Sequence, residues 1–340
     1  MRSSQASPGR LLALLDDFAG VRVAVFGDLL VDEFIYGQIS RVSREAPVLI
    51  LEYGSTEIVP GGAGNAAANI AALGAKAMSI GVTGKDEPGR RLIETMTGRI
   101  DVRNIVSHRE MTTPTKTRIL AGGVHSAKQQ VVRVDRAPRQ SIPEEVRQAV
   151  ARRLFSVLGR CDALLVSDYG TGLVLPALIS RAQKVLRGPG KRQPPVLIDS
   201  RYALLEFRRM TTCTPNESEV EQLLGIRIGE NRRVLERAGR ELLTRTRAGA
   251  VVITRGSRGM ALFERDRPTV HIPIFGSDQI ADVTGAGDTV IATMTLALAA
   301  GGSCEEAARL ANYAGGLVVM KRGTATVSAE EVKAAIRADR

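Results

Sequence analysis

The second half of the sequence alternates helical segments with short apolar ones, and this alternation restricts the fold more than any other feature. The spacing of apolar residues predicts helices over 143–158 and 175–186, and strands over 163–167 and 196–199. Such alternation indicates parallel strands joined by crossover helices. Residues 21–26 contain little polar surface, as expected of a strand buried on both faces. We therefore predict an α/β fold with a doubly wound, mostly parallel sheet flanked by helices.

Two β-rich segments interrupt this pattern. Residues 32–60 and 109–136 contain shorter runs that mix polar and apolar side chains, which is typical of half-exposed strands. The two segments could pair with each other, so we expect them to form one small β-sheet lid. The remaining residues, 1–31, 61–108 and 137–340, are then expected to form the α/β core.

The chain is basic, and its charge limits the classes of ligand. There are 47 Lys and Arg residues against 36 Asp and Glu residues, a formal net charge of +11. Such a charge attracts nucleic acid, an acidic membrane or a phosphorylated small molecule. The basic residues are dispersed, without interleaved aromatic residues or zinc-finger spacing, so we expect neither nucleic acid nor a membrane as partner. A basic solvated surface explains most of the charge, and phosphorylated ligands are a second cause.

Cysteine usage indicates a reducing compartment. Cys161, Cys213 and Cys304 are odd in number and far apart, which suits neither a disulfide framework nor a CxxC metal site. The N-terminus lacks an apolar signal core, and the sequence has no apolar run long enough to cross a membrane. We therefore expect a cytoplasmic protein.

Residues 282–289 join a glycine turn to a long apolar helix. Gly285 and Gly287 leave backbone N–H groups uncovered at the positive end of that helix, so the turn is suited to hold an anion. Asp288 then has two interpretations. Its carboxylate can cap the helix. It can instead be a general base that takes a proton from a hydroxyl while the amides hold a transferring phosphoryl group.

Polar residues directly follow several predicted strands. Parallel strands place ligands at their carboxyl ends, so these positions would meet at one edge of the sheet. Any one of them could be a loop cap, whereas their recurrence favours an active-site rim. The residues concerned are Asp28, Asp32, Asp168, Tyr169, Gly170, Asp199, Ser200, Arg201, Thr254, Arg255 and Gly256.

Residues 214–219 begin a further helix. Asn216 and Glu219 have the spacing of a capping box. The same side chains suit the waters of Mg²⁺, which prefers hard oxygen ligands and keeps some of its waters. The two interpretations are compatible, and both stay open.

Common fingerprints of other enzymes are missing. GxxxxGK[ST] does not occur, and residues 62–67 lack the third Gly of GxGxxG. His108, His125 and His271 are dispersed, which argues against a zinc site and a Ser-His-Asp constellation. P-loop and dinucleotide-binding enzymes are therefore poorly supported.

Three motifs occur in order along the chain: Gly61-Gly62-Ala63-Gly64-Asn65, Asn216-x-x-Glu219 and Asp282-x-x-Gly285-Ala286-Gly287-Asp288. In these motifs the chain resembles the ribokinase-like, or phosphofructokinase-B type, carbohydrate kinases over nearly its whole length. The resemblance implies an α/β sandwich with a small β-sheet lid over the sugar. It also implies ATP and Mg²⁺ as cofactors and a sugar phosphate as substrate. The lid sheet has edges that could pair across a homodimer.

Within this family the chain is most similar to the branch that phosphorylates the anomeric hydroxyl of D-glycero-β-D-manno-heptose 7-phosphate, in the synthesis of the ADP-heptose precursor of lipopolysaccharide core. Thr171 departs from that branch, which usually carries Lys there, and this puts sugar specificity or nucleotide contacts in question. The alternatives are a kinase of this fold for ribose, fructose phosphate or a keto-deoxy acid, and a silent sugar or nucleotide sensor. Since the sequence ends at Arg340, we expect no adenylyltransferase domain. The similarity lies at Tyr36-Gly37, Ser40-Arg41-x-Ser43-x-Glu45-Ala46-Pro47, Ser167-Asp168-Tyr169-Gly170, Thr214-Pro215-Asn216-x-Ser218-Glu219 and Gly323-Thr324-x-Thr326-Val327.

The resemblance also implies roles for single residues. Asp288 would accept the proton of the sugar hydroxyl, and the Mg²⁺ ion would lie near Asn216 and Glu219, held through water. For the sugar's own phosphate we predict cationic donors from the second lid segment, because a buried dianion needs them. These donors are Lys116, Arg118 and Arg133. The anion hole would be formed by the amides of Gly285, Ala286 and Gly287. The sugar would contact Asp28, Asp32, Gly61, Gly62 and Asn65. The nucleotide would border Asn216, Thr254, Gly256, Gly259 and Asn312.

Overall fold

A computed structural model of the chain describes residues 6–122, 128–137, 140–188, 193–276, 282–321 and 323–339. Its main element is a nine-stranded sheet in the order β13-β12-β11-β10-β9-β8-β1-β4-β5. Neighbouring strands from β11 to β5 are parallel, and the pairs β11–β12 and β12–β13 are antiparallel. The strands are β1 (Arg22–Gly27), β4 (Lys76–Gly84), β5 (Asp101–His108), β8 (Ala163–Asp168), β9 (Val196–Ser200), β10 (Thr212–Cys213), β11 (Ala250–Thr254), β12 (Met260–Glu264) and β13 (Val270–Ile272).

Helices cover both faces of this sheet. In β1, Val23 and Val25 join an apolar cluster that includes side chains of α1, α2, α3, α8, α9 and α10. Ala24 and Phe26 point the other way, into a cluster with α4, α5, α6 and α7. Because both faces are buried, the strands are apolar throughout, which confirms the predicted doubly wound α/β class. The helices are α1 (Pro8–Asp16), α2 (Ala63–Ala72), α3 (Glu87–Met96), α4 (Glu144–Leu158), α5 (Pro176–Leu186), α6 (Glu217–Leu224), α7 (Arg232–Thr246), α8 (Ala286–Ala299), α9 (Cys304–Val318) and α10 (Ala329–Ala338).

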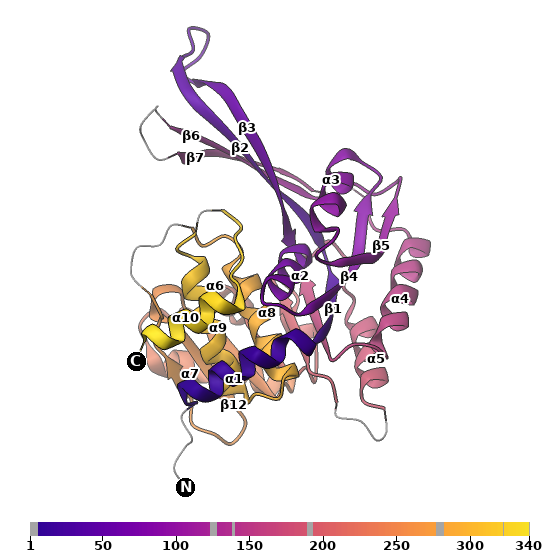
Figure 1. Cartoon of the computed structure of the whole chain (residues 1–340), viewed down its shortest axis with the longest axis vertical. Coiled ribbons are helices and arrows are strands. Elements are labelled where there is room, and N and C mark those ends of the chain that lie inside the picture. Colours follow the sequence, from indigo (N-terminus) through magenta and orange to yellow (C-terminus); the bar gives the residue numbers. More distant parts are fainter. Residues whose placement is uncertain are drawn as a thin grey trace.

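A second, four-stranded sheet projects from the core as a curved ribbon, with α2 beside its root (Figure 1). Its order is β3-β2-β6-β7, in which β2 pairs antiparallel with β3 and parallel with β6. The strands are β2 (Leu29–Val42), β3 (Leu49–Gly62), β6 (Thr115–Gly122) and β7 (Gln129–Arg136). The two β-rich segments of the sequence therefore do pair with each other, through β2 and β6.

The parallel strands bring their carboxyl ends to the edge of the core from which the ribbon projects. β2 begins at Leu29, two residues after β1 ends, and β3 ends at Gly62, directly before α2. The small sheet is thus attached at both of these strand ends without a connecting loop. Among the described residues, no helix has the length and apolar character needed to cross a bilayer.

Candidate active site

A cavity of about 400 Å³ lies where the carboxyl ends of the core strands meet the root of the small sheet. Most of the contributing core elements carry polar residues that follow a strand or begin a helix, and the small sheet adds Lys116, Arg118 and Arg133 from β6 and β7. The structure therefore brings together residues that are up to 258 positions apart in the chain, from Leu30 to Asp288. The predicted site residues that line the cavity are Asp32, Gly62, Lys116, Arg118, Arg133, Asn216, Glu219, Thr254, Gly285, Gly287 and Asp288.

Asp288 lies in the first turn of α8 with 4% of its surface exposed. Its Oδ2 accepts a hydrogen bond from Asn65 Nδ2 at 2.8 Å, and its Oδ1 accepts one from the Tyr169 hydroxyl at 3.2 Å. Burial raises the pKa of this carboxyl to about 7, although the two hydrogen bonds lower it. The N-cap position belongs to Gly285, and the Asp288 side chain makes no capping bond. The carboxylate therefore makes no capping bond, and burial lets it hold a proton at much higher pH than an ordinary Asp does.

Gly285 allows Asn65 to approach α8 closely. It adopts a φ of 78°, and a Cβ atom there would lie 2.5 Å from Asn65 Nδ2. A side chain at this position would push Asn65 away from Asp288. Gly287 has no neighbour within 4 Å of such an atom, so its backbone is open toward the cavity.

The cationic side chains of the cavity differ in how far they are already neutralised. Arg118 makes a buried ion pair with Asp32, each side chain being 9% exposed, and Arg133 pairs with Asp135 at 2.9 Å. Lys116 has no ion pair with any described residue; its ammonium lies 5.1 Å from the centre of the Tyr169 ring. Burial lowers the pKa of Lys116. Of the three predicted phosphate donors, Lys116 is the one whose charge is uncompensated in the described part of the chain.

Asp28 lies behind the cavity. Its carboxylate accepts hydrogen bonds from the amides of Tyr169 and Thr171, at 2.8 and 3.2 Å, and from the Thr171 hydroxyl. Burial raises the pKa of Asp28, while the bonds from Thr171 lower it. Thr171, the departure from the heptose branch, therefore helps to hold the loop after β8. Sugar binding by Asp28 stays a prediction.

The other predicted residues outside the cavity lining have identifiable positions. Gly61 packs against Asp32, since a Cβ there would lie 2.6 Å from Asp32 Oδ2. Asn312 on α9 donates to the Pro273 carbonyl at 2.8 Å. Gly256 begins the short helix η3 (Gly256–Arg258), Gly259 is its C-cap, and Ala286 is the first residue of α8. Their predicted nucleotide or anion contacts stay predictions.

Asn216 and Glu219 form the expected capping box of α6. Asn216 N donates to Glu219 Oε2 and Glu219 N donates to Asn216 Oδ1, both at 2.9 Å. Burial raises the pKa of Glu219. The hydroxyl of Thr214 is buried beside them, lines the same cavity and has no hydrogen-bond partner among the described residues. A buried polar atom without a partner at a cavity wall indicates a place for a polar ligand or its water.

Several cavity residues were singled out only as rim positions or not at all. Tyr169 and Arg201 line the cavity directly after β8 and β9, and Asp199 lines it from the carboxyl end of β9, so their place at strand ends is the available signal. Burial raises the pKa of Asp199 well above its usual range. Asn69, one turn after Asn65, carried a different signal: an amide within a helix otherwise made of small and apolar residues. His108 and His271 do not line the cavity, and His125 lies outside the described residues.

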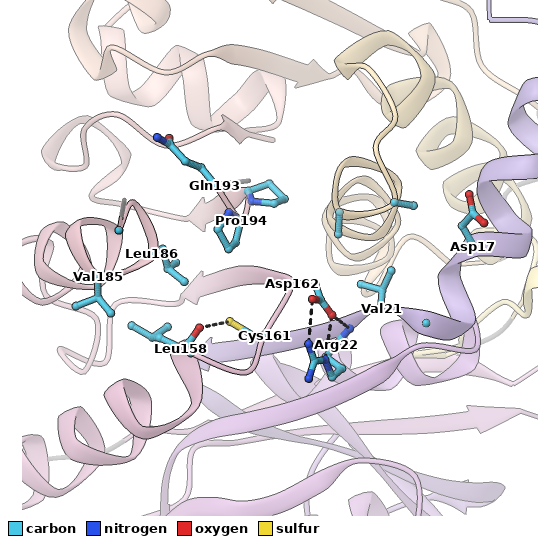
Figure 2. A pocket seen from close by; sticks show the side chains of 16 residues that line it. Asp17, Val21, Arg22, Leu158, Cys161, Asp162, Val185, Leu186, Gln193 and Pro194 are labelled. Atoms are coloured by element: carbon cyan, nitrogen blue, oxygen red, sulfur yellow. Dashed lines mark hydrogen bonds and ion pairs between the residues drawn. The ribbon is translucent and has the colours of Figure 1, made fainter. Parts of the chain in front are cut away.

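A larger cavity of about 740 Å³ lies at the opposite end of the sheet, before β1, β8 and β9 (Figure 2). Its charged residues Arg22 and Asp162 bond to each other through two atom pairs, at 3.1 and 3.2 Å. Cys161 donates to the Leu158 carbonyl at 3.4 Å, and burial raises the pKa of its thiol to about 11. Such a thiol is a poor nucleophile. We therefore place the chemistry at the carboxyl ends of the strands.

Comparison with known proteins identifies the family of the chain. The model of the pfkB family carbohydrate kinases matches residues 22–331. The bifunctional protein HldE of Geobacter sulfurreducens is 40% identical over 316 residues, which cover 92% of this chain and 62% of that protein. HldE of Desulfatibacillum aliphaticivorans is 38% identical over 322 residues, covering 94% and 64%. The chain thus spans about three fifths of the length of these curated relatives.

Solved structures show the same fold at low identity. Arabidopsis thaliana ribokinase complexed with ribose and ATP has a TM-score of 0.70 at 19% identity, covering 93% of this chain and 99% of that one. Escherichia coli phosphofructokinase-2 has a TM-score of 0.73 at 20% identity, covering 94% and 100%. The ribokinase-like fold, with its large mostly parallel sheet and smaller second sheet, is thereby confirmed.

Proposed function

The chain belongs to the pfkB family of carbohydrate kinases, and from this premise we propose that it phosphorylates the anomeric hydroxyl of D-glycero-β-D-manno-heptose 7-phosphate to the 1,7-bisphosphate. The observation that carries the proposal is the Asp288 carboxylate, which is buried at the cavity wall with its pKa raised to about 7. The choice of a heptose phosphate rests on the motifs shared with the heptose branch and on the similarity to the HldE proteins.

In the proposed reaction Asp288 accepts the proton of the sugar hydroxyl. The hydroxyl oxygen forms a bond to the γ-phosphorus of ATP, the bond from that phosphorus to the bridging oxygen breaks, and ADP leaves with the electron pair. The amides of Gly285, Ala286 and Gly287 stabilise the charge on the transferred group. A carboxylate with a pKa near 7 suits this task, because it is substantially ionised at neutral pH and still basic enough to hold the proton.

The donors near α6 fit a hydrated Mg²⁺ ion. Glu219 uses its Oε2 in the capping box, so its Oε1 is available to a ligand. Among the described residues, no group of three or more His, Cys, Asp or Glu side chains could hold a metal directly. A site with few protein ligands suits Mg²⁺, because this ion keeps several of its waters and binds to phosphates. Asn216, Glu219 and the unpartnered Thr214 hydroxyl would hold the waters of the ion. When bound, Mg²⁺ would neutralise charge on the triphosphate.

The test of the proposal is ATP consumption against a panel of acceptors. The panel holds heptose 7-phosphate, the free heptose, ribose, fructose 6-phosphate and a keto-deoxy acid. We expect heptose 7-phosphate to give the highest kcat/KM and the free heptose to lose most of it. Preference for any other member would replace the heptose assignment, and no consumption with any sugar would favour a silent sensor.

Lys116 is expected to recognise the phosphate of the sugar. Lys116→Met should raise KM for the sugar phosphate by about 10–100-fold, because one charge-assisted contact is lost. KM for ATP should change little. Lys128→Met is the matched control, because Lys128 directly precedes β7 of the same small sheet, lies over the Tyr36 ring and does not line the cavity. Equal KM values for Lys116→Met and the wild type would remove Lys116 from the phosphate site.

We also propose that the chain forms a homodimer through the small sheet. Large apolar side chains are exposed on that sheet, and such surfaces on a soluble enzyme mark contact sites. The most exposed of them are Val42 at 59%, Val48 at 56% and Tyr53 at 70%. Val132 and Val134, at 46% and 45%, lie two residues apart on β7 and so share one face.

Val134→Lys should convert the dimer to a monomer by placing a charge on this face. The measurement is molar mass by light scattering after size exclusion. Val185→Lys is the control, at a valine on α5 that is 53% exposed against 45% for Val134, and it should leave the mass unchanged. A wild-type protein that is monomeric at micromolar concentration, or a Val134→Lys dimer, would contradict this interface.

A further inference from the structure

Two asparagines one turn apart are buried on α2, a helix whose other residues are apolar. Asn65 is 1% exposed and Asn69 is 0% exposed, and the rest of α2 (Ala63–Ala72) consists of Ala, Gly and Ile. A buried amide destabilises a helix interface unless every polar atom finds a partner. Alanine would serve the packing of α2 against α8 at lower cost. The two amides therefore require an explanation other than folding.

Their hydrogen bonds form a continuous path to Asp288. The Thr289 hydroxyl donates to Asn69 Oδ1 at 2.8 Å, and Asn69 Nδ2 donates to Asn65 Oδ1 at 3.1 Å. Asn65 Nδ2 then donates to Asp288 Oδ2 at 2.8 Å. Thr289 is the residue next to Asp288 on α8, so the path begins and ends on that helix.

The direction of the path is determined by a backbone carbonyl. Asn69 Nδ2 also donates to the Asn65 backbone oxygen at 3.0 Å, and a carbonyl oxygen can only accept. The NH₂ group of Asn69 must therefore face Asn65. The Asn65 side chain must in turn present its oxygen to Asn69, which leaves its NH₂ group facing Asp288. If the Asn65 amide were reversed, its oxygen would face the carboxylate and two NH₂ groups would face each other.

We propose that Asn69 and Thr289 are positioning residues: they hold the Asn65 amide in the orientation that donates to the Asp288 carboxylate. The proposal rests on the role of Asp288 as the base of the proposed kinase reaction. Without this donor, the carboxylate would keep the Tyr169 hydroxyl as its remaining bonded neighbour. Its ionised form would then be less stable, and its orientation toward the substrate less fixed.

The direct test replaces Asn69 by Leu, which has the same number and branching of side-chain heavy atoms and no polar atom. Other groups that act on Asp288 are unchanged: the Tyr169 hydroxyl, the negative charge of Asp32 and the positive charge of Lys116, with Asp199 nearby. We expect the midpoint at which kcat rises with pH to shift upward by about one pH unit, because one hydrogen bond to a charge usually contributes about that much. Turnover should fall about fivefold at pH 7 and recover above pH 9. A merely structural role would give a loss that alkaline pH does not restore.

Matched variants on α8 control this experiment. Thr289→Val should move the pH profile of kcat to higher pH, as Asn69→Leu does. Thr289→Ser should keep the wild-type profile, because only the hydroxyl is needed. Thr293→Val removes a hydroxyl of equal burial one turn further along, which donates to the Thr289 carbonyl at 2.8 Å. It should leave the pH profile unchanged. A wild-type profile in Thr289→Val and in Asn69→Leu, or the same shift in Thr293→Val, would overturn the proposal.

An equilibrium measurement keeps this proposal separate from the kinase assignment. The pKa of Asp288 is about 7 in the folded chain, against an ordinary value of 3.8. Between these values the folded state binds a proton that the unfolded state does not, so the free energy of unfolding falls as pH rises. The difference in this free energy between wild type and Asp288→Asn therefore reports the pKa without any substrate.

In the Asn69→Leu background we measure the same difference in the free energy of unfolding, with and without Asp288→Asn. This difference should keep changing with pH up to a value about one pH unit higher than it does without Asn69→Leu. An unchanged midpoint would refute the positioning role, even if no sugar is phosphorylated. A shifted midpoint together with an inactive enzyme would refute the kinase assignment alone. If Asn69→Leu does not fold, the Thr289→Val and Thr289→Ser pair supplies the same comparison.

Discussion

Asp288→Asn is expected to lower turnover by about 10²–10⁴-fold while ATP binding stays within a factor of a few. This is the usual contribution of a positioned general base. Asparagine preserves the shape of the side chain and can still accept a hydrogen bond from Asn65. The change therefore removes the proton acceptor and little else. Turnover is measured by single-turnover kinetics with saturating sugar, and ATP binding by titration calorimetry.

Asp162→Asn is the matched control for this prediction. Asp162 pairs with Arg22 beside the larger cavity at the opposite end of the sheet, where we place no chemistry (Figure 2). The Asp162→Asn variant should keep turnover near the wild-type value. Near-normal turnover in Asp288→Asn would end the base assignment, and a large loss in Asp162→Asn would question which end of the sheet is catalytic.

The second large effect is expected on stability, at Gly259. A Cβ atom at this residue would lie 2.1 Å from the Ile272 carbonyl oxygen and 2.8 Å from Ile274 N, and its φ of 73° disfavours any side chain. Gly259→Ala should therefore lower the free energy of unfolding by about 3–5 kcal/mol, the range of severe steric changes. The measurement is chemical denaturation followed by circular dichroism.

Gly256 offers a comparison within the same loop. Its φ of 55° is also left-handed, but a Cβ atom at this residue would have no neighbour within 4 Å, so only backbone strain remains. Gly256→Ala should cost about 1–2 kcal/mol. Equal losses in stability in the two variants would mean that steric contact with Ile272 and Ile274 is not what requires glycine at 259. KM for ATP in both variants will then show whether either residue borders the nucleotide.

The sequence predicted the core of the fold because its strands are buried on both faces. The segments 163–167 and 143–158 correspond within one residue to β8 and α4. β5 was not anticipated, since its sequence mixes Asp, Arg, Asn and His with apolar residues, as an edge strand can. The long pairing of β2 with β3 was also underestimated, because its outer half is exposed and lacks an apolar pattern.

The site was predictable where function coincides with local structure. Asn216 and Glu219 could be identified because a capping box is a local pattern. The partners of Asp288 are different, since Tyr169 and Asn65 reach it from other strands and helices over 119 and 223 positions. Only the tertiary structure shows which side chains point at one another. The orientation of an amide, on which the Asn65 argument depends, has no counterpart in the sequence.

The small sheet has a mechanical consequence. β2 and β3 pair from Leu29 with Gly62 at the cavity to Val42 with Leu49 at the tip, which makes a ribbon about 45 Å long. Asp32 lies near the root of this ribbon, and the exposed side chain of Val42 lies at its tip. The proposed dimer contact at the tip would therefore also restrain Asp32 and the neighbouring side chains at the cavity wall.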